Sequence, residues 1–116
     1  MDDTSRVQSL TEGAERMPFE GGSVYAMGKA ALIGLVKGLA RDLGPRGITI
    51  NNVQPGPTDT DLNPANGDFA DMLRKLMALP RYGTAEEIAA LVAYLAGPEA
   101  GFVTGASLTI DGGFTA

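Results

Sequence analysis

Helix-like and strand-like segments alternate along this sequence, and the alternation limits the folds that the chain can adopt. From Ser23 onward, apolar residues recur at three- and four-residue steps and predict an amphipathic helix that ends at Gly44 and Pro45. The apolar face of this helix consists of Leu32, Leu35, Val36, Leu39 and Leu43. A β-branched run over residues 48–53 then predicts a strand, which the turn residues 55–57 close.

Two more helices and a second strand are predicted further along the chain. The first of these helices stops before Pro80, and its apolar positions are Phe69, Met72, Leu73, Leu76 and Met77. The second begins at Thr84, because Thr84 and Glu87 have the spacing of a capping box, and it ends at Gly97. Residues 107–110 form the last predicted strand. Helices that separate strands in this order indicate α/β architecture with parallel strands.

The predicted sheet is too small to be complete. An isolated pair of strands is marginal in water, and a parallel sheet normally has further strands and is covered on both faces. A second copy of the same chain is the simplest source of the missing strands. The sequence therefore predicts an incomplete parallel α/β sheet, and we expect homo-oligomerisation through the sheet edges to complete it.

The first 22 residues show no clear hydrophobic period. They are polar and acidic, and glycine and proline interrupt them. We expect residues 1–22 to be a partly flexible lead-in and residues 23–116 to form one α/β domain.

Composition narrows the possible functions. Nine basic and fourteen acidic residues give a net charge of −5, which opposes phosphate binding, so we expect no nucleic-acid partner. The chain has no Cys and no His, so we expect no metal site, and acid–base chemistry must use Tyr, Lys or carboxylates. No apolar run reaches the roughly 20 residues of a membrane span, and the N-terminus has no secretory pattern. We expect a cytoplasmic protein without a membrane partner.

Tyr25 and Lys29 are the residues best suited to such chemistry. They stand four apart, so a helix brings them to one face, one turn from each other. An ammonium about 4 Å from a phenol favours the phenolate and can lower the tyrosine pKa by about one to three units. On spacing alone, a packed tyrosine and a solvated lysine are the commoner arrangement.

Several ordered motifs resemble those of short-chain dehydrogenases/reductases. The segment around Tyr25 and Lys29, Ser-Val-Tyr-Ala-Met-Gly-Lys-Ala-Ala, resembles the Tyr-x-x-x-Lys helix of that family. Residues 44–53 resemble the loop and strand that come next, and residues 102–105 and 108–113 resemble the closing motif. The resemblance implies the C-terminal half of such an enzyme, with a partial Rossmann-like fold, the C-terminal portion of a doubly wound parallel sheet.

This resemblance runs from Arg16 to Gly113 and implies a role for several residues. Tyr25 would exchange a proton with the substrate oxygen, and Lys29 would lower the tyrosine pKa and hold the cofactor ribose. Thr11 stands where the family has its active-site Ser, with Ser9 and Ser5 as alternatives. The residues that would contact the nicotinamide are Pro55, Gly56, Thr58 and Thr60. The implied cofactor is NAD or NADP.

The family's Tyr-Lys helix lies at a subunit interface. The resemblance therefore implies a dimer or tetramer in which this helix packs against a second copy through small residues. These residues are Ala26, Ala30, Ala31 and Gly34.

One departure from the family leaves three functions open. No glycine-rich phosphate loop opens a helix after a strand, and the acidic residue that would hold the ribose is missing with it. The first function is an NAD(P)-dependent oxidoreductase whose dinucleotide-binding half comes from another subunit or polypeptide. The second is a truncated, non-catalytic oligomerising protein that binds no cofactor. The third is a cofactor-independent, esterase-like hydrolase in which Tyr25 and Lys29 activate the hydroxyl of Ser23 or Thr11.

Overall fold

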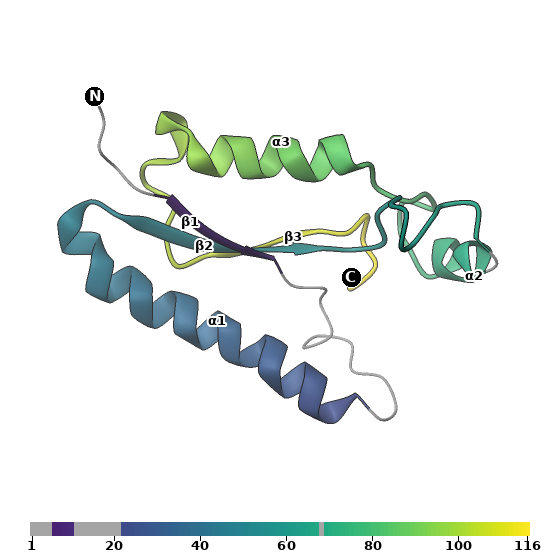
Figure 1. The fold of residues 1–116 in the computed structure, drawn as a ribbon, viewed down its shortest axis with the longest axis horizontal. Coiled ribbons are helices and arrows are strands. Elements are labelled where there is room, and N and C mark those ends of the chain that lie inside the picture. The colour runs from purple at the N-terminus through teal and green to yellow at the C-terminus, as the bar shows by residue number, and fades with distance from the viewer. Residues whose placement is uncertain (1–5, 11–21, 68) are drawn as a thin grey trace.

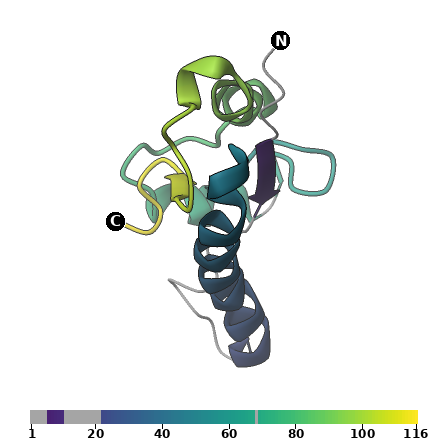
Figure 2. The same cartoon turned by 90° about the vertical axis from the view of Figure 1, so that its left-hand side faces the viewer.

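The structure is a sheet with one helix on each face (Figures 1 and 2). The computed structural model describes residues 6–10, 22–67 and 69–116. The parallel strands of the sheet lie in the order β1 (Arg6–Leu10), β2 (Thr49–Pro55) and β3 (Ser107–Ile110). Helix α1 (Ser23–Leu43) covers one face of the sheet and α3 (Ala85–Ala96) covers the other. The α/β architecture with parallel strands is confirmed.

Strand β1 was missed by the sequence analysis, which predicted two strands. It lies in the segment that was expected to be a lead-in, and it pairs with β2 in a register that joins Val7 to Ile50 and Leu10 to Val53. The sequence Arg-Val-Gln-Ser-Leu contains only two apolar residues, so its local pattern is weak. Pairing with β2 specifies this strand, and it makes β2 the central strand of the sheet.

Helix α1 has the predicted bounds but not all of the predicted buried face. It continues beyond Leu43 into a short 3-10 helix (Gly44–Arg46), after which Gly47 at φ 73° turns the chain toward β2. Val36 of α1 is buried. Leu35, which belongs to the same predicted apolar face, is 53% exposed. One face of a sheet therefore buries fewer of the apolar side chains of α1 than the sequence pattern predicts.

The two helices predicted after β2 are both present in the structure. Helix α2 (Ala70–Lys75) is shorter than its apolar pattern suggested and leaves most of that pattern exposed, although Met77 just beyond it is buried. Helix α3 begins with the predicted capping box. The Glu87 N–H donates to Thr84 Oγ1 at 3.1 Å, and Glu87 Oε1 accepts from the Thr84 N–H at 3.0 Å.

The core lies between the sheet and α3. Val53 of β2, Leu95 of α3 and Ala100 of the following 3-10 helix (Pro98–Ala100) are fully buried against one another. Leu108 and Ile110 of β3 pack against this cluster. Among the described helices, none is long and apolar enough to cross a membrane.

Candidate functional site

The candidate site lies at the carboxyl edge of the sheet. A short connection joins the end of α1 to the start of β2, so α1 runs back along the sheet and its first turns lie toward the carboxyl ends of the strands (Figure 1). The loop after β2 and helix α2 extend from the same edge. In open α/β sheets this edge is where ligands bind.

Tyr25 and Lys29 both belong to the first two turns of α1. Their backbone positions put them one turn apart on the same side of the helix. The side chain of Lys29 is half-buried. Only the helical backbone of Tyr25 is described. The pairing of its phenol with the Lys29 ammonium therefore stays a prediction. Thr11, the expected counterpart of the family Ser, lies outside the described residues.

The four residues expected to contact a nicotinamide line one cleft. Pro55, Gly56, Thr58 and Thr60 follow one another from the end of β2 and border a cleft of about 580 Å³. The other residues that line it are Pro57, Leu62, Asn63, Phe69, Leu73 and Phe114. The described lining thus comes from the loop after β2, from the start of α2 and from the C-terminal tail. The sequence analysis placed Phe69 and Leu73 only on the apolar face of a helix, and it did not assign Leu62 or Phe114. The position of Leu62 in the loop after the Pro-Gly turn was a usable signal, whereas Phe114 lies far from that turn in the sequence.

Backbone hydrogen bonds fix the loop that carries these four residues. The Gly56 N–H donates to the Ile110 carbonyl at 3.0 Å, which ties the loop to the end of β3. Further along, Gly83 bridges the loop, because its N–H donates to the Pro57 carbonyl and its carbonyl accepts from the Asp59 N–H, each at 2.9 Å. The loop is therefore held on both sides.

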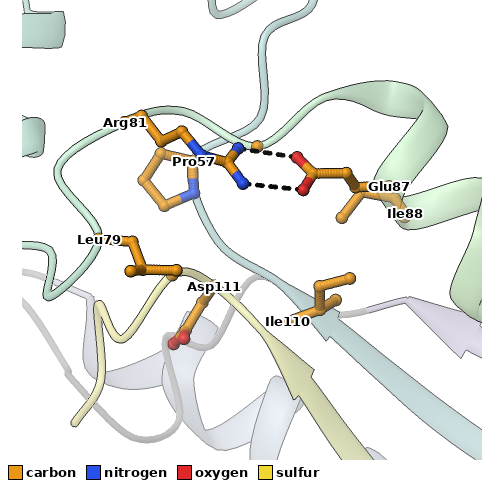
Figure 3. Close-up of a pocket in the computed structure, with 9 residues that line it drawn as sticks. Pro57, Leu79, Arg81, Glu87, Ile88, Ile110 and Asp111 are labelled. Atoms are coloured by element: carbon orange, nitrogen blue, oxygen red, sulfur yellow. Dashed lines mark hydrogen bonds and ion pairs between the residues drawn. The ribbon is translucent and has the colours of Figure 1, made fainter.

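Arg81 anchors the Gly83 segment to helix α3. Figure 3 shows its guanidinium facing the Glu87 carboxylate, with N···O distances of 2.8 and 2.9 Å. The hydrogen bonds from Arg81 and from the Thr84 N–H hold the pKa of Glu87 at about 2, and the same pair raises the pKa of Arg81. The sequence analysis assigned Glu87 only to the capping box and missed Arg81, which stands three residues before the cap.

Asp111 holds the C-terminal tail in place through hydrogen bonds. Its carboxylate accepts hydrogen bonds from the Gly113 N–H at 2.9 Å and from the Thr115 hydroxyl at 2.7 Å. Partial burial would raise the pKa of Asp111, but the hydrogen bonds from Thr115, Gly113 and Phe114 outweigh it and lower that pKa below its usual value. These bonds fold the tail so that Phe114 borders the cleft.

The cleft fits one end of a dinucleotide cofactor. The nicotinamide ring is uncharged in the reduced cofactor, and the proline, glycine and threonine residues of the lining are uncharged as well. The described lining contains no charged side chain, so the cleft does not suit a pyrophosphate. Elsewhere in the described part of the chain, no group of three acidic side chains is arranged to hold a metal ion.

Comparison with known proteins places this arrangement in context. A family model described as enoyl-(acyl carrier protein) reductase matches residues 1–115. The chain is 65% identical over 102 residues to the cyclic-di-GMP-binding biofilm dispersal mediator protein of Escherichia coli, a match that covers 88% of the chain and 43% of that protein.

Solved structures agree with the sequence matches. A short-chain dehydrogenase/reductase from Serratia marcescens has a TM-score of 0.92 at 64% identity, and the match covers 100% of this chain and 48% of that one. A short-chain dehydrogenase from Burkholderia cenocepacia in complex with NADP has a TM-score of 0.89 at 55% identity, with 96% and 46% covered. The chain thus spans less than half the length of each of these relatives.

Proposed function

Because this chain belongs to the short-chain dehydrogenase/reductase family, we propose that it supplies the proton-transfer and nicotinamide-facing part of an NAD(P)-dependent oxidoreductase site. The observation that carries the proposal is the cleft shared by Pro55, Gly56, Thr58 and Thr60 at the carboxyl edge of the sheet. The first turns of α1, with Tyr25 and Lys29, are directed toward the same edge.

In this proposal the chain moves a proton. When bound, the reduced cofactor supplies a hydride to the carbonyl carbon of the substrate. Tyr25 donates its phenolic proton to the carbonyl oxygen, so that an alcohol forms and the phenolate remains. The positive charge of Lys29, one helical turn away, stabilises that phenolate. In the reverse direction the phenolate accepts the proton of the alcohol.

The phosphate end of the cofactor needs residues that this sequence does not offer. The described cleft lining is uncharged, and no glycine-rich loop opens a helix after a strand. We propose that residues outside this sequence hold the phosphates. On this proposal the chain alone binds the cofactor weakly or turns over slowly.

A fluorescence titration of NADPH and NADH into the purified chain tests the proposal. We expect saturable binding that Lys29→Ala weakens, whereas Lys37→Ala, an exposed lysine two turns further along α1, is the matched control. Light scattering on the same sample reports the oligomeric state in which any binding occurs. Cyclic-di-GMP is included as a competitor, because the Escherichia coli relative is named for binding it.

The same samples discriminate the other two functions. No binding of either cofactor up to about 1 mM, the upper range of ordinary KM values, would rule out an autonomous dehydrogenase. Hydrolysis of a simple ester that is lost in Tyr25→Phe would then favour the hydrolase. A stable multimer with neither activity would favour the non-catalytic oligomerising protein.

A further inference from the structure

A second, smaller cavity adjoins the loop after β2. It has a volume of about 130 Å³, and it is bordered by the end of β3, the start of α3 and the segment between α2 and α3 (Figure 3). Of its described lining residues, only Pro57 also borders the cleft proposed for the nicotinamide. The cavity is therefore a separate site that shares one wall with that cleft.

The walls of this cavity are mainly apolar. Leu79, Ile88 and Ile110 come from three different parts of the chain, and all three line it. In Figure 3 the Arg81–Glu87 ion pair borders one side of the cavity, and Leu79 and Ile110 border the other. A ligand that covers apolar walls removes them from water, which favours a ligand that is itself apolar.

The charged groups of the lining are already paired. Arg81 donates to both carboxylate oxygens of Glu87, at 2.8 and 2.9 Å, and to the Tyr82 carbonyl at 3.1 Å. The Asp111 carboxylate accepts hydrogen bonds from the C-terminal tail. A charged ligand of either sign would lose its water and would compete with these pairs for a partner in the described lining, which is costly.

Hydrogen bonds between its walls hold the cavity in shape. The Leu79 N–H donates to the Gly112 carbonyl at 2.7 Å, and the Gly83 N–H donates to the Pro57 carbonyl at 2.9 Å. All four of these residues line the cavity. Its volume is close to the value of about 150 Å³ at which an apolar cavity in another protein binds benzene. The size therefore suits a small ring compound and excludes a cofactor.

The wall shared with the cleft connects the two sites. Gly83 lines the cavity, and its carbonyl accepts from the Asp59 N–H of the loop after β2 at 2.9 Å. When this hydrogen bond opens, the loop separates from the Gly83 wall. A ligand that binds only to the closed cavity opposes the opening, so its occupancy makes the loop more rigid.

We propose that this cavity is a second ligand site, that it takes a small, uncharged, apolar molecule about the size of benzene, and that its occupancy stabilises the loop after β2. The ligand acts through the bond between Gly83 and Asp59 and takes no part in the reaction. Any change that it causes in cofactor affinity must be matched by an equal change in its own affinity when the cofactor is bound.

Benzene, benzoate and benzylammonium test the ligand class by direct binding. Each is titrated into the ¹⁵N-labelled full chain without cofactor. The amides of Gly83, Ile88 and Gly112 report on the cavity, and those of Leu62 and Leu73 report on the cleft. We expect benzene to shift the cavity amides saturably and to bind at least about tenfold more tightly than either charged compound. Equal or tighter binding of a charged compound would overturn the ligand class.

A larger side chain in the lining should exclude the ligand. Leu79→Phe enlarges a lining residue that is 57% exposed, and we expect it to lower the affinity for benzene at least about tenfold. Leu76→Phe is the matched control, because Leu76 is 55% exposed and is not among the described residues that line the cavity. Undiminished binding in Leu79→Phe, or shifts confined to the cleft amides, would overturn the assignment of the site.

Hydrogen exchange tests the effect on the loop. At a benzene concentration of twice the dissociation constant, we expect exchange of the Asp59 amide to slow about threefold. The Gly67 amide, which donates to the Pro64 carbonyl in a turn further along the chain, is the control and should not change. Bound benzene without slower exchange at Asp59 would reject the effect on the loop.

These experiments contain no cofactor, so they are decided separately from the proposed function. Absence of benzene binding would overturn this inference and would not bear on the binding of NADPH. Benzene binding with the expected pattern would support it, even if NADPH did not bind to the chain.

Discussion

Asn51 and Asn52 are adjacent in β2 and equally buried, but their side chains differ in hydrogen bonding. Asn51 Nδ2 donates to the Val103 carbonyl at 3.0 Å, and its Oδ1 accepts from the Ala106 N–H at 3.1 Å. In the described part of the chain, neither Nδ2 nor Oδ1 of Asn52 has a hydrogen-bond partner. Successive strand residues point to opposite faces of a sheet, so only Asn51 reaches the connection that leads into β3.

Exchanging each asparagine for valine should therefore change stability in opposite directions. Asn52→Val removes an unpaired buried amide, and we expect the free energy of unfolding to rise by about 1–2 kcal/mol. Asn51→Val leaves the Val103 carbonyl and the Ala106 N–H without their partner, and we expect a loss of about 1–3 kcal/mol. Urea unfolding of both variants measures the difference, and a loss of similar size in both would contradict the assignment.

The Arg81–Glu87 pair predicts a specific pH dependence. The folded-state pKa of Glu87 is about 2, below its ordinary value of 4.5, so the pair contributes stability above that ordinary value. The contribution is lost as the pH falls through the folded-state pKa. The urea midpoint of Glu87→Gln should lie below that of the parent chain at neutral pH and converge on it as the pH approaches 2. Glu86→Gln, in the same first turn of α3, should show no comparable convergence.

Gly56 allows β3 to approach the loop of the candidate site. A Cβ at position 56 would lie 2.5 Å from the Cβ and 2.7 Å from the Cα of Asp111, so the backbone would have to move. We expect Gly56→Ala to lower the free energy of unfolding by about 1–3 kcal/mol and to weaken cofactor binding. Gly34→Ala, with nothing within 4 Å of the added methyl, should instead stabilise the isolated chain by up to about 1 kcal/mol. Thermal unfolding of the two variants distinguishes them.

Association through α1 remains a prediction that one exposed residue can test. Met27 is 67% exposed on the first half of α1, the helix through which the family resemblance implies contact with a second copy. Met27→Lys should convert the multimer into a monomer, since an unpaired charge in a helix contact is costly. The molar mass from light scattering gives the answer, and Phe102→Lys, at an exposed residue on the connection between α3 and β3, is the control. A mass unaffected by Met27→Lys would rule out this face as the contact.

Local patterns determined most of the secondary structure. The periodic leucines gave α1 its bounds, Thr84 and Glu87 gave α3 its start, and residues 107–110 gave β3 its place, because each signal lies within a few neighbouring residues. Strand β1 could not be predicted in the same way. Its five residues carry little pattern of their own, and their register is set by β2, which lies about forty residues away in the sequence.

Part of the candidate site could also be predicted from the sequence, and part of it could not. The sequence alone determined which residue types stand at positions 25, 29 and 55–60, since motifs are fixed by chain order. Only the tertiary structure decided that Leu62, Phe69 and Phe114 meet around that loop, and that Arg81 holds it through Glu87. Such contacts join segments far apart in the chain, and whether a side chain is buried, exposed or paired depends on the neighbours that folding brings to it.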